Sequence, residues 1–126
     1  MVNQVGLFMT DTTIYGIANC DKVRSARAWL EGHAVAHRFH DFRLDGLTRE
    51  LLDRWCDEQE WMALLNRQST SWRKLAPDAL ALADHREGAM ALMLQQPTLI
   101  RRPVLRHGAM LLIGFDVNRY SALFEQ

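Results

Sequence analysis

Hydrophobic and polar positions follow two different periods near the start of this chain. The β-prone run at 12–17 predicts a strand, which ends in a polar turn. Beyond the turn, apolar residues recur at the i, i+3, i+7 spacing of an amphipathic helix, as Val23, Ala26 and Leu30. Asn19 is a suitable N-cap for this helix and Gly32 a suitable end. We therefore predict a strand that leads directly into a helix.

A second β-prone run, at 35–42, closes a strand–helix–strand unit, and its helical crossover predicts a parallel pair of strands. The middle of the chain has the pattern of helices instead. Thr48 is a suitable cap for a helix that ends near Glu58, with Leu47 and Leu52 at the positions of a hydrophobic staple. Beyond it we predict a short apolar segment at 61–65, a polar loop at 66–71, and helices at 77–85 and 87–95.

The last part of the chain returns to strands. The runs 103–106 and 110–113 flank a short polar turn and predict a β-hairpin, after which Asp116 can cap a helix that reaches Phe124. This order of elements predicts an α/β protein with a thioredoxin-like mixed sheet. The sheet combines a parallel pair with an antiparallel hairpin, and a helical insertion separates the second strand from the third.

Length and composition agree with one domain. A chain of 126 residues with 48% hydrophobic content can build a single core, which excludes a two-domain enzyme and a disordered chain. We predict one domain over 1–126, with its core at about 12–124 and the helical insertion at about 48–96. Residues 1–11 show no clear period and are predicted to be a loosely ordered lead-in.

Charge and hydropathy limit the classes of binding partner and the cellular location that we expect. The 15 Lys and Arg residues balance the 15 Asp and Glu residues, so no net charge attracts nucleic acid or an anionic membrane. The most hydrophobic uncharged stretch, 88–100, is shorter than the ~20 residues that cross a bilayer. A signal peptide begins with basic residues, and none precedes Lys22 here. Two cysteines are also too few for a disulfide-stapled fold. We expect a cytoplasmic monomer.

Cys20 is the strongest candidate for chemistry. It lies at the predicted start of the first helix, where free backbone N–H groups and the helix dipole favour a thiolate. Arg24, one turn further on, is expected to add to this effect. The alternative is that Cys20 is only a small residue at a strand end. Val23 stands where a C-x-x-C motif has its second cysteine, so a resolving thiol must come from a small molecule or another protein.

The second cysteine and the histidines give weaker signals. Cys56 lies one helical turn from Leu52 on an apolar stripe, which favours burial over a redox role. The five histidines show no spacing typical of a zinc site. The chain also has neither of the glycine-rich motifs that hold nucleotide phosphates. We therefore expect no metal and no tightly bound cofactor.

Three segments taken together resemble the arsenate reductase and Spx-related family of thioredoxin-fold proteins. The first is IYGIANCD at 14–21, which is similar to the family's first strand and cysteine turn. The second is NRQSTSWRKL at 66–75, which is similar to its mid-chain loop. The third is QPTLIRRP at 96–103, which is similar to its proline loop. The resemblance covers roughly residues 12 to 124. Within the family the chain is most similar to small bacterial proteins described as glutathione-dependent thiol reductases, which also match the run RFHDFRLDGL at 38–47.

The resemblance implies roles for particular residues. In arsenate reductases the cysteine attacks the oxyanion and three arginines hold it. Cys20 matches that nucleophile, and Arg102 matches the arginine before the proline, whose peptide bond at Arg102-Pro103 is then expected to be cis. Read alone, two adjacent arginines there would also fit a solvated loop. The other two arginines match poorly, because Asn66 stands one place before Arg67 and the third position falls at 113–114, where no residue is basic.

We therefore predict a glutathione-dependent monothiol reductase, a thiol-dependent oxidoreductase. The Cys20 thiolate would attack a disulfide or an oxyanion, and glutathione would resolve the adduct as co-substrate. The expected substrate- or anion-binding residues are Asn19, Arg24, Arg67, Arg102 and Pro103. Two alternatives stay open: a true arsenate reductase, and a non-enzymatic Spx-like module that binds RNA polymerase. The missing C-x-x-C removes the redox switch of the latter but not its binding surface.

Overall fold

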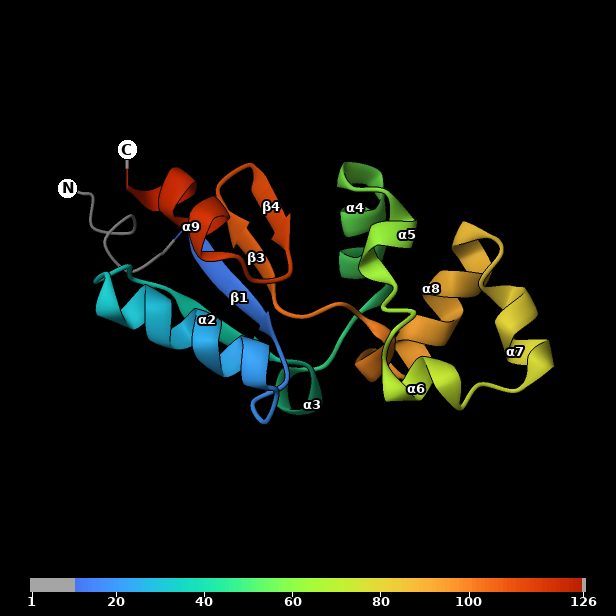
Figure 1. Ribbon diagram of the computed structural model, residues 1–126. Coiled ribbons are helices and arrows are strands. Elements are labelled where there is room, and N and C mark those ends of the chain that lie inside the picture. The colour runs from blue at the N-terminus through green and yellow to red at the C-terminus, as the bar shows by residue number, and fades with distance from the viewer. Residues whose placement is uncertain (1–10, 126) are drawn as a thin grey trace. The chain divides into compact units, whose positions relative to one another are not determined.

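The computed structural model describes residues 11–125, which divide into two compact units (Figure 1). The first unit contains the described residues up to Asp45 together with those from Arg102 onward, and the second is Gly46–Arg101. The lead-in predicted at 1–11 lies outside the described residues except for Asp11. No helix in the described part of the chain is long and apolar enough to span a membrane.

The first unit is built on a four-stranded mixed sheet in the order β2-β1-β3-β4. Its strands are β1 (Thr12–Gly16), β2 (Arg38–Asp41), β3 (Val104–His107) and β4 (Met110–Ile113). β1 pairs in parallel with β2 and antiparallel with β3, which pairs antiparallel with β4. The predicted parallel pair and hairpin are therefore confirmed, as is the thioredoxin-like mixed sheet. Three helices complete the unit: α2 (Asp21–Gly32), α3 (Phe42–Asp45) and α9 (Val117–Phe124).

Two local details differ from the prediction. Cys20, not Asn19, is the N-cap of α2, because its carbonyl is the first to accept a helical hydrogen bond, from the Arg24 amide at 2.9 Å. The short helix α3 was not expected after β2. Its backbone is held by the Asp41 carboxylate, which accepts from the Arg43 amide at 2.8 Å.

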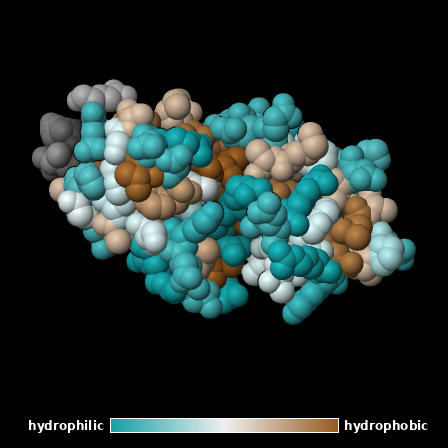
Figure 2. Space-filling view, viewed as in Figure 1, coloured by the Kyte–Doolittle hydropathy of each residue, from teal (hydrophilic) through white to brown (hydrophobic). Residues whose placement is uncertain are grey.

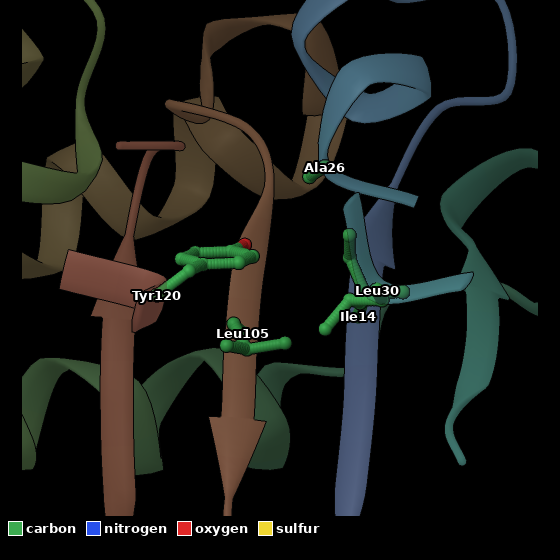
Figure 3. Packing of buried hydrophobic residues seen from close by; sticks show 5 residues of the cluster. All are labelled: Ile14, Ala26, Leu30, Leu105 and Tyr120. Carbon is green, nitrogen blue, oxygen red and sulfur yellow. The ribbon is translucent and has the colours of Figure 1, made fainter. Parts of the chain in front are cut away.

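The core of this unit lies between the sheet and the two longer helices, α2 and α9 (Figure 3). Ile14 and Leu105 are paired across β1 and β3, and both are fully buried. The helices cover them with three more fully buried residues: Ala26, Leu30 and Tyr120. The apolar spacing that predicted α2 is thus the face that fills this core.

Tyr120 brings a polar atom into this core. Its hydroxyl is buried, with no hydrogen-bond partner among the described residues, and burial raises the pKa of its phenol above the usual range. Removing a buried, unsatisfied hydroxyl while keeping the ring removes a desolvation cost. We expect Tyr120→Phe to raise the free energy of unfolding by about 1 kcal/mol. Chemical denaturation would measure this change, and a loss of stability would show that the hydroxyl is satisfied in solution.

The second unit is helical. Its elements are α4 (Arg49–Glu58), α5 (Trp61–Leu64), α6 (Thr70–Arg73), α7 (Pro77–Leu82), α8 (Arg86–Gln95) and the 3-10 helix η1 (Pro97–Leu99). The predicted cap of α4 is confirmed, because the Thr48 hydroxyl accepts from the Leu51 amide at 3.1 Å. The polar loop expected at 66–71 is partly wrong. Its end enters α6, because the Ser69 hydroxyl caps that turn by accepting from the Trp72 amide at 3.1 Å.

Candidate functional site: a thiol at a helix start

Cys20 lies in the first unit, where the chain leaves β1 and enters α2. Its own amide donates to the Ile17 carbonyl at 3.2 Å, which closes the turn after the strand. Its backbone has extended geometry at the N-cap of α2. The thiol is half-buried and free, so it combines access for a reagent with the positive end of the helix dipole.

The surroundings of this thiol favour its charged form. Burial raises the pKa of Cys20, but stronger combined effects oppose it. The Val23 backbone and the Arg102 side chain hydrogen-bond the sulfur, the Arg102 charge attracts the thiolate, and the Lys22 backbone adds a further hydrogen bond. As a result the pKa of Cys20 lies below its ordinary value.

Arg102 belongs to the same unit as Cys20, although the two residues are far apart in the sequence. Its side chain interacts with the Cys20 sulfur. Arg102 is separated from β3 only by Pro103, and the Arg102-Pro103 peptide bond is cis, as predicted. The residue that follows β4 holds this segment in place, since the Pro103 carbonyl accepts a hydrogen bond from the Gly114 amide at 2.8 Å. Gly114 has φ +84, a left-handed conformation that suits glycine. The backbone next to Arg102 is thus held by a contact with the residue that follows the hairpin.

The remaining predicted residues have other positions or partners. Asn19 is exposed in the turn before α2. Arg24 forms an ion pair with Asp21 one turn away, and it is not among the main causes that shift the Cys20 pKa. The influence expected from Arg24 is therefore exerted by Arg102. Arg67 belongs to the second unit, where its guanidinium lies 5.1 Å from the centre of the Trp72 ring.

Sequence reasoning missed one residue that shapes this turn. A Cβ added at Gly16, the last residue of β1, would lie 2.6 Å from a methyl carbon of Val23. The glycine therefore lets the first turn of α2 approach the end of β1 closely. That approach places the Val23 backbone near the thiol. A glycine at the end of a strand, next to a polar turn, can indicate such a close approach of two backbone segments.

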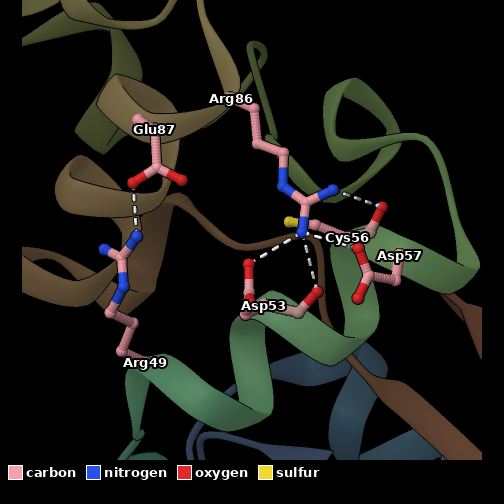
Figure 4. Close-up of polar contacts among 6 residues, drawn as sticks. All are labelled: Arg49, Asp53, Cys56, Asp57, Arg86 and Glu87. Carbon is pink, nitrogen blue, oxygen red and sulfur yellow. Dashed lines mark hydrogen bonds and ion pairs between the residues drawn. The ribbon is translucent and has the colours of Figure 1, made fainter.

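Cys56 has a different environment in the second unit (Figure 4). It is only 6% exposed, and burial raises the pKa of its thiol. Arg86 lies beside it, but the guanidinium is bound to the Asp53 carboxylate at 2.7 Å and to the Asp57 carboxylate at 2.8 Å. The burial predicted for Cys56 is confirmed. The described residues contain no group of three or more His, Cys, Asp or Glu arranged to hold a metal ion.

The different environments of the two thiols predict different reactivity. Alkylation by iodoacetamide requires the thiolate, so its rate follows the thiolate fraction as the pH rises. We expect Cys20 to react with an apparent pKa below the ~8.5 of a free cysteine, and Cys56 to react more slowly at every pH near neutrality. Arg102→Gln, which removes the charge, is expected to raise the apparent pKa of Cys20. An unchanged value in this variant would contradict the role assigned to Arg102.

The four-stranded mixed sheet, with a cysteine at the start of its first helix and a cis-proline before β3, defines a class: proteins with a thioredoxin-like fold. The model of the ArsC family matches residues 15–123, and the chain belongs to this family.

Individual relatives support this assignment. A protein of Haemophilus influenzae described as uncharacterized is 38% identical over 112 residues, 89% of this chain and 97% of the relative. The global transcriptional regulator Spx of Streptococcus agalactiae is 30% identical over 116 residues, 90% of this chain and 83% of the regulator.

Solved structures agree with the fold. The YFFB protein has a TM-score of 0.83 at 45% identity and covers 88% of this chain and 96% of its own. An arsenate reductase (ArsC) related protein from Brucella melitensis has a TM-score of 0.73 at 43% identity, over 94% of this chain and 98% of its own. The arsenate reductase from Vibrio cholerae, at 22% identity and a TM-score of 0.65, shows the fold alone.

Proposed function

We propose that this chain is a glutathione-dependent monothiol reductase with Cys20 as its nucleophile. The observation that supports this most directly is the environment of the Cys20 thiol. The Val23 and Lys22 backbones and the Arg102 side chain lower its pKa, and Val23 occupies the place of a second cysteine in the turn. A stabilised thiolate with no local resolving thiol is suited to chemistry in which a soluble thiol completes the cycle.

The proposed cycle consists of two thiol–disulfide exchanges. The Cys20 thiolate attacks one sulfur of a disulfide substrate, forms a mixed disulfide with that half, and releases the other half as a thiolate, which takes a proton from water. The glutathione thiolate then attacks the substrate sulfur of the mixed disulfide and releases the Cys20 thiolate. One substrate disulfide and one glutathione thus yield one free thiol and one glutathione mixed disulfide, without another oxidant or reductant.

Arg102 has two roles in this proposal. It stabilises the Cys20 thiolate before the attack and stabilises it again as the leaving group of the second exchange. Its guanidinium also offers donors for a carboxylate of glutathione. We propose further that Asn19, Pro103 and Arg24, which belong to the same unit as Cys20, bind the substrate. Arg24 already pairs with Asp21, which partly neutralises its charge, so its contribution is expected to be smaller than that of Arg102.

Arsenate is expected to be a poor substrate. A compact tetrahedral oxyanion needs several donors that converge on one point, whereas glutathione carries two carboxylates that dispersed groups can hold. Of the positions that match the family's three arginines, only Arg102 carries a guanidinium, since Asn66 and the pair at 113–114 are uncharged. Reduction of arsenate, if it occurs, should be slow beside exchange with a glutathione mixed disulfide.

Calorimetry with glutathione, alongside a coupled reductase assay, tests this function. We expect detectable binding that Arg102→Ala weakens by about 1–3 kcal/mol, the usual loss for a charged hydrogen bond. The matched control is Arg43→Ala, which removes an exposed arginine of the same unit and should leave binding unchanged.

Other outcomes would favour the alternatives. Rapid arsenate turnover without glutathione binding or an adduct would favour an arsenate reductase. No turnover, together with specific capture of purified RNA polymerase, would favour a role like that of the Spx relative.

A further inference from the structure

A groove lies between the edge strand β4 and helix α9, on residues that the reductase chemistry does not use. Its volume is about 340 Å³, and its walls are formed by Met110, Leu112, Arg119, Ala122 and Leu123. This volume falls at the lower end of the range of small-molecule sites, roughly 300–1,000 Å³. Figure 2 shows hydrophobic surface in this part of the molecule, interrupted by hydrophilic side chains.

The walls of the groove are apolar except for one charged group. Met110 is 50% exposed although it is a large apolar side chain, and Leu112 and Leu123 are only partly buried. Covering such exposed apolar surface with a ligand lowers the free energy, because it removes that surface from water. None of the described residues that line the groove is acidic, so none of them balances the charge of Arg119.

Arg119 is held in a defined orientation. Its guanidinium donates to the Ile113 carbonyl at 3.0 Å, and it forms no ion pair with a described carboxylate. A guanidinium has five N–H donors, so this bond leaves donors for an anionic acceptor. A carboxylate can accept two parallel hydrogen bonds from this fork.

The hydrogen bond from Arg119 to the Ile113 carbonyl also makes a peptide ligand less suitable for this groove. β4 is an edge of the sheet, and an added peptide strand would need its free carbonyl groups as acceptors. Arg119 already occupies the Ile113 carbonyl, so addition of a strand is disfavoured at this end of β4. The groove is thus better suited to a ligand that uses apolar contacts and one anionic head.

We propose that this groove binds a medium-chain acyl carboxylate. The acyl chain lies along Met110, Leu112 and Leu123, and the carboxylate pairs with Arg119. The site is independent of Cys20, and its occupation requires no step of the reductase cycle.

Methyl NMR of the full chain, with labelled Met and Leu residues, tests this site with decanoate as the probe. Titration to low millimolar concentration should shift the methyl resonances of Met110, Leu112 and Leu123 in a saturable way. Decylamine, which has the same chain length and the opposite charge, should bind at least about tenfold more weakly, and Arg119→Gln should remove this difference. The control Arg38→Gln, in an exposed arginine on the opposite edge strand β2, should retain it.

Three results would overturn the proposal. They are the absence of saturable shifts at these methyl groups, equal affinity for decanoate and decylamine, and an Arg119→Gln variant that keeps the preference for decanoate. Arg119 is exposed, so its replacement is not expected to unfold the chain, and the dispersion of the remaining methyl resonances will verify this in the same spectra.

Discussion

Replacing Cys20 by serine is expected to abolish both the mixed disulfide with glutathione and all turnover of disulfide substrates. A serine hydroxyl keeps the size of the side chain, but it does not ionise near neutral pH and cannot form the sulfur–sulfur bond on which the cycle depends. The loss should therefore be complete, rather than the partial loss expected for Arg102 variants. Mass spectrometry after exposure to oxidised glutathione would measure the adduct, and a coupled assay would measure turnover.

Cys56→Ser is the matched control for this experiment. Cys56 is buried with a raised pKa, so this variant should form the same single adduct as the unaltered chain and keep its turnover. An adduct at Cys56, or activity that survives in Cys20→Ser, would refute the assignment of Cys20 as the nucleophile. Retained folding of both variants can be verified by circular dichroism.

The largest expected effect on stability comes from Gly88→Ala. A Cβ at Gly88 would lie 2.0 Å from the carbonyl oxygen of Leu82 and 2.8 Å from its carbonyl carbon. These are backbone atoms at the end of α7, so a rotamer change cannot relieve the clash, and α7 must move away from α8. We expect a loss of at least about 3 kcal/mol in the free energy of unfolding, at the upper end of overpacking costs.

Gly32→Ala separates this clash from the general effect of replacing a helical glycine. A Cβ at Gly32 would meet nothing within 4 Å, so this variant should be neutral or more stable by up to about 1 kcal/mol. Urea denaturation of both variants measures the difference. Equal stability of the two would show that α7 and α8 can separate at little cost.

Local patterns were sufficient to predict much of this chain. The apolar spacing of Val23, Ala26 and Leu30 predicted α2, and all three side chains are buried. Thr48 and Asp116 were identified as caps, and each accepts a hydrogen bond from a nearby helical amide. Such features depend on neighbours within a few residues, which is why the sequence alone reveals them.

Short elements stabilised by a single side chain were harder to predict. The helix α3 depends on the bond from the Arg43 amide to Asp41, and α6 depends on the cap by Ser69. Both segments have only four residues, too few to show a helical period, so their sequences look like loops. The boundary of β2 moved for a related reason: the chain turns at Ala34, where φ is +55, and pairing with β1 begins only at Arg38.

The sequence by itself determined the order of elements along the chain, the position of Cys20 at a helix start and the absence of a second cysteine in its turn. Only the tertiary structure decided which arginine acts on the thiol. Arg24 is near Cys20 in the chain but pairs with Asp21, whereas Arg102 is distant in the chain and is brought to the sulfur by the pairing of β3 with β1. The physical reason is that a charge acts through distance in space, and the pairing of β1 with β3 sets that distance.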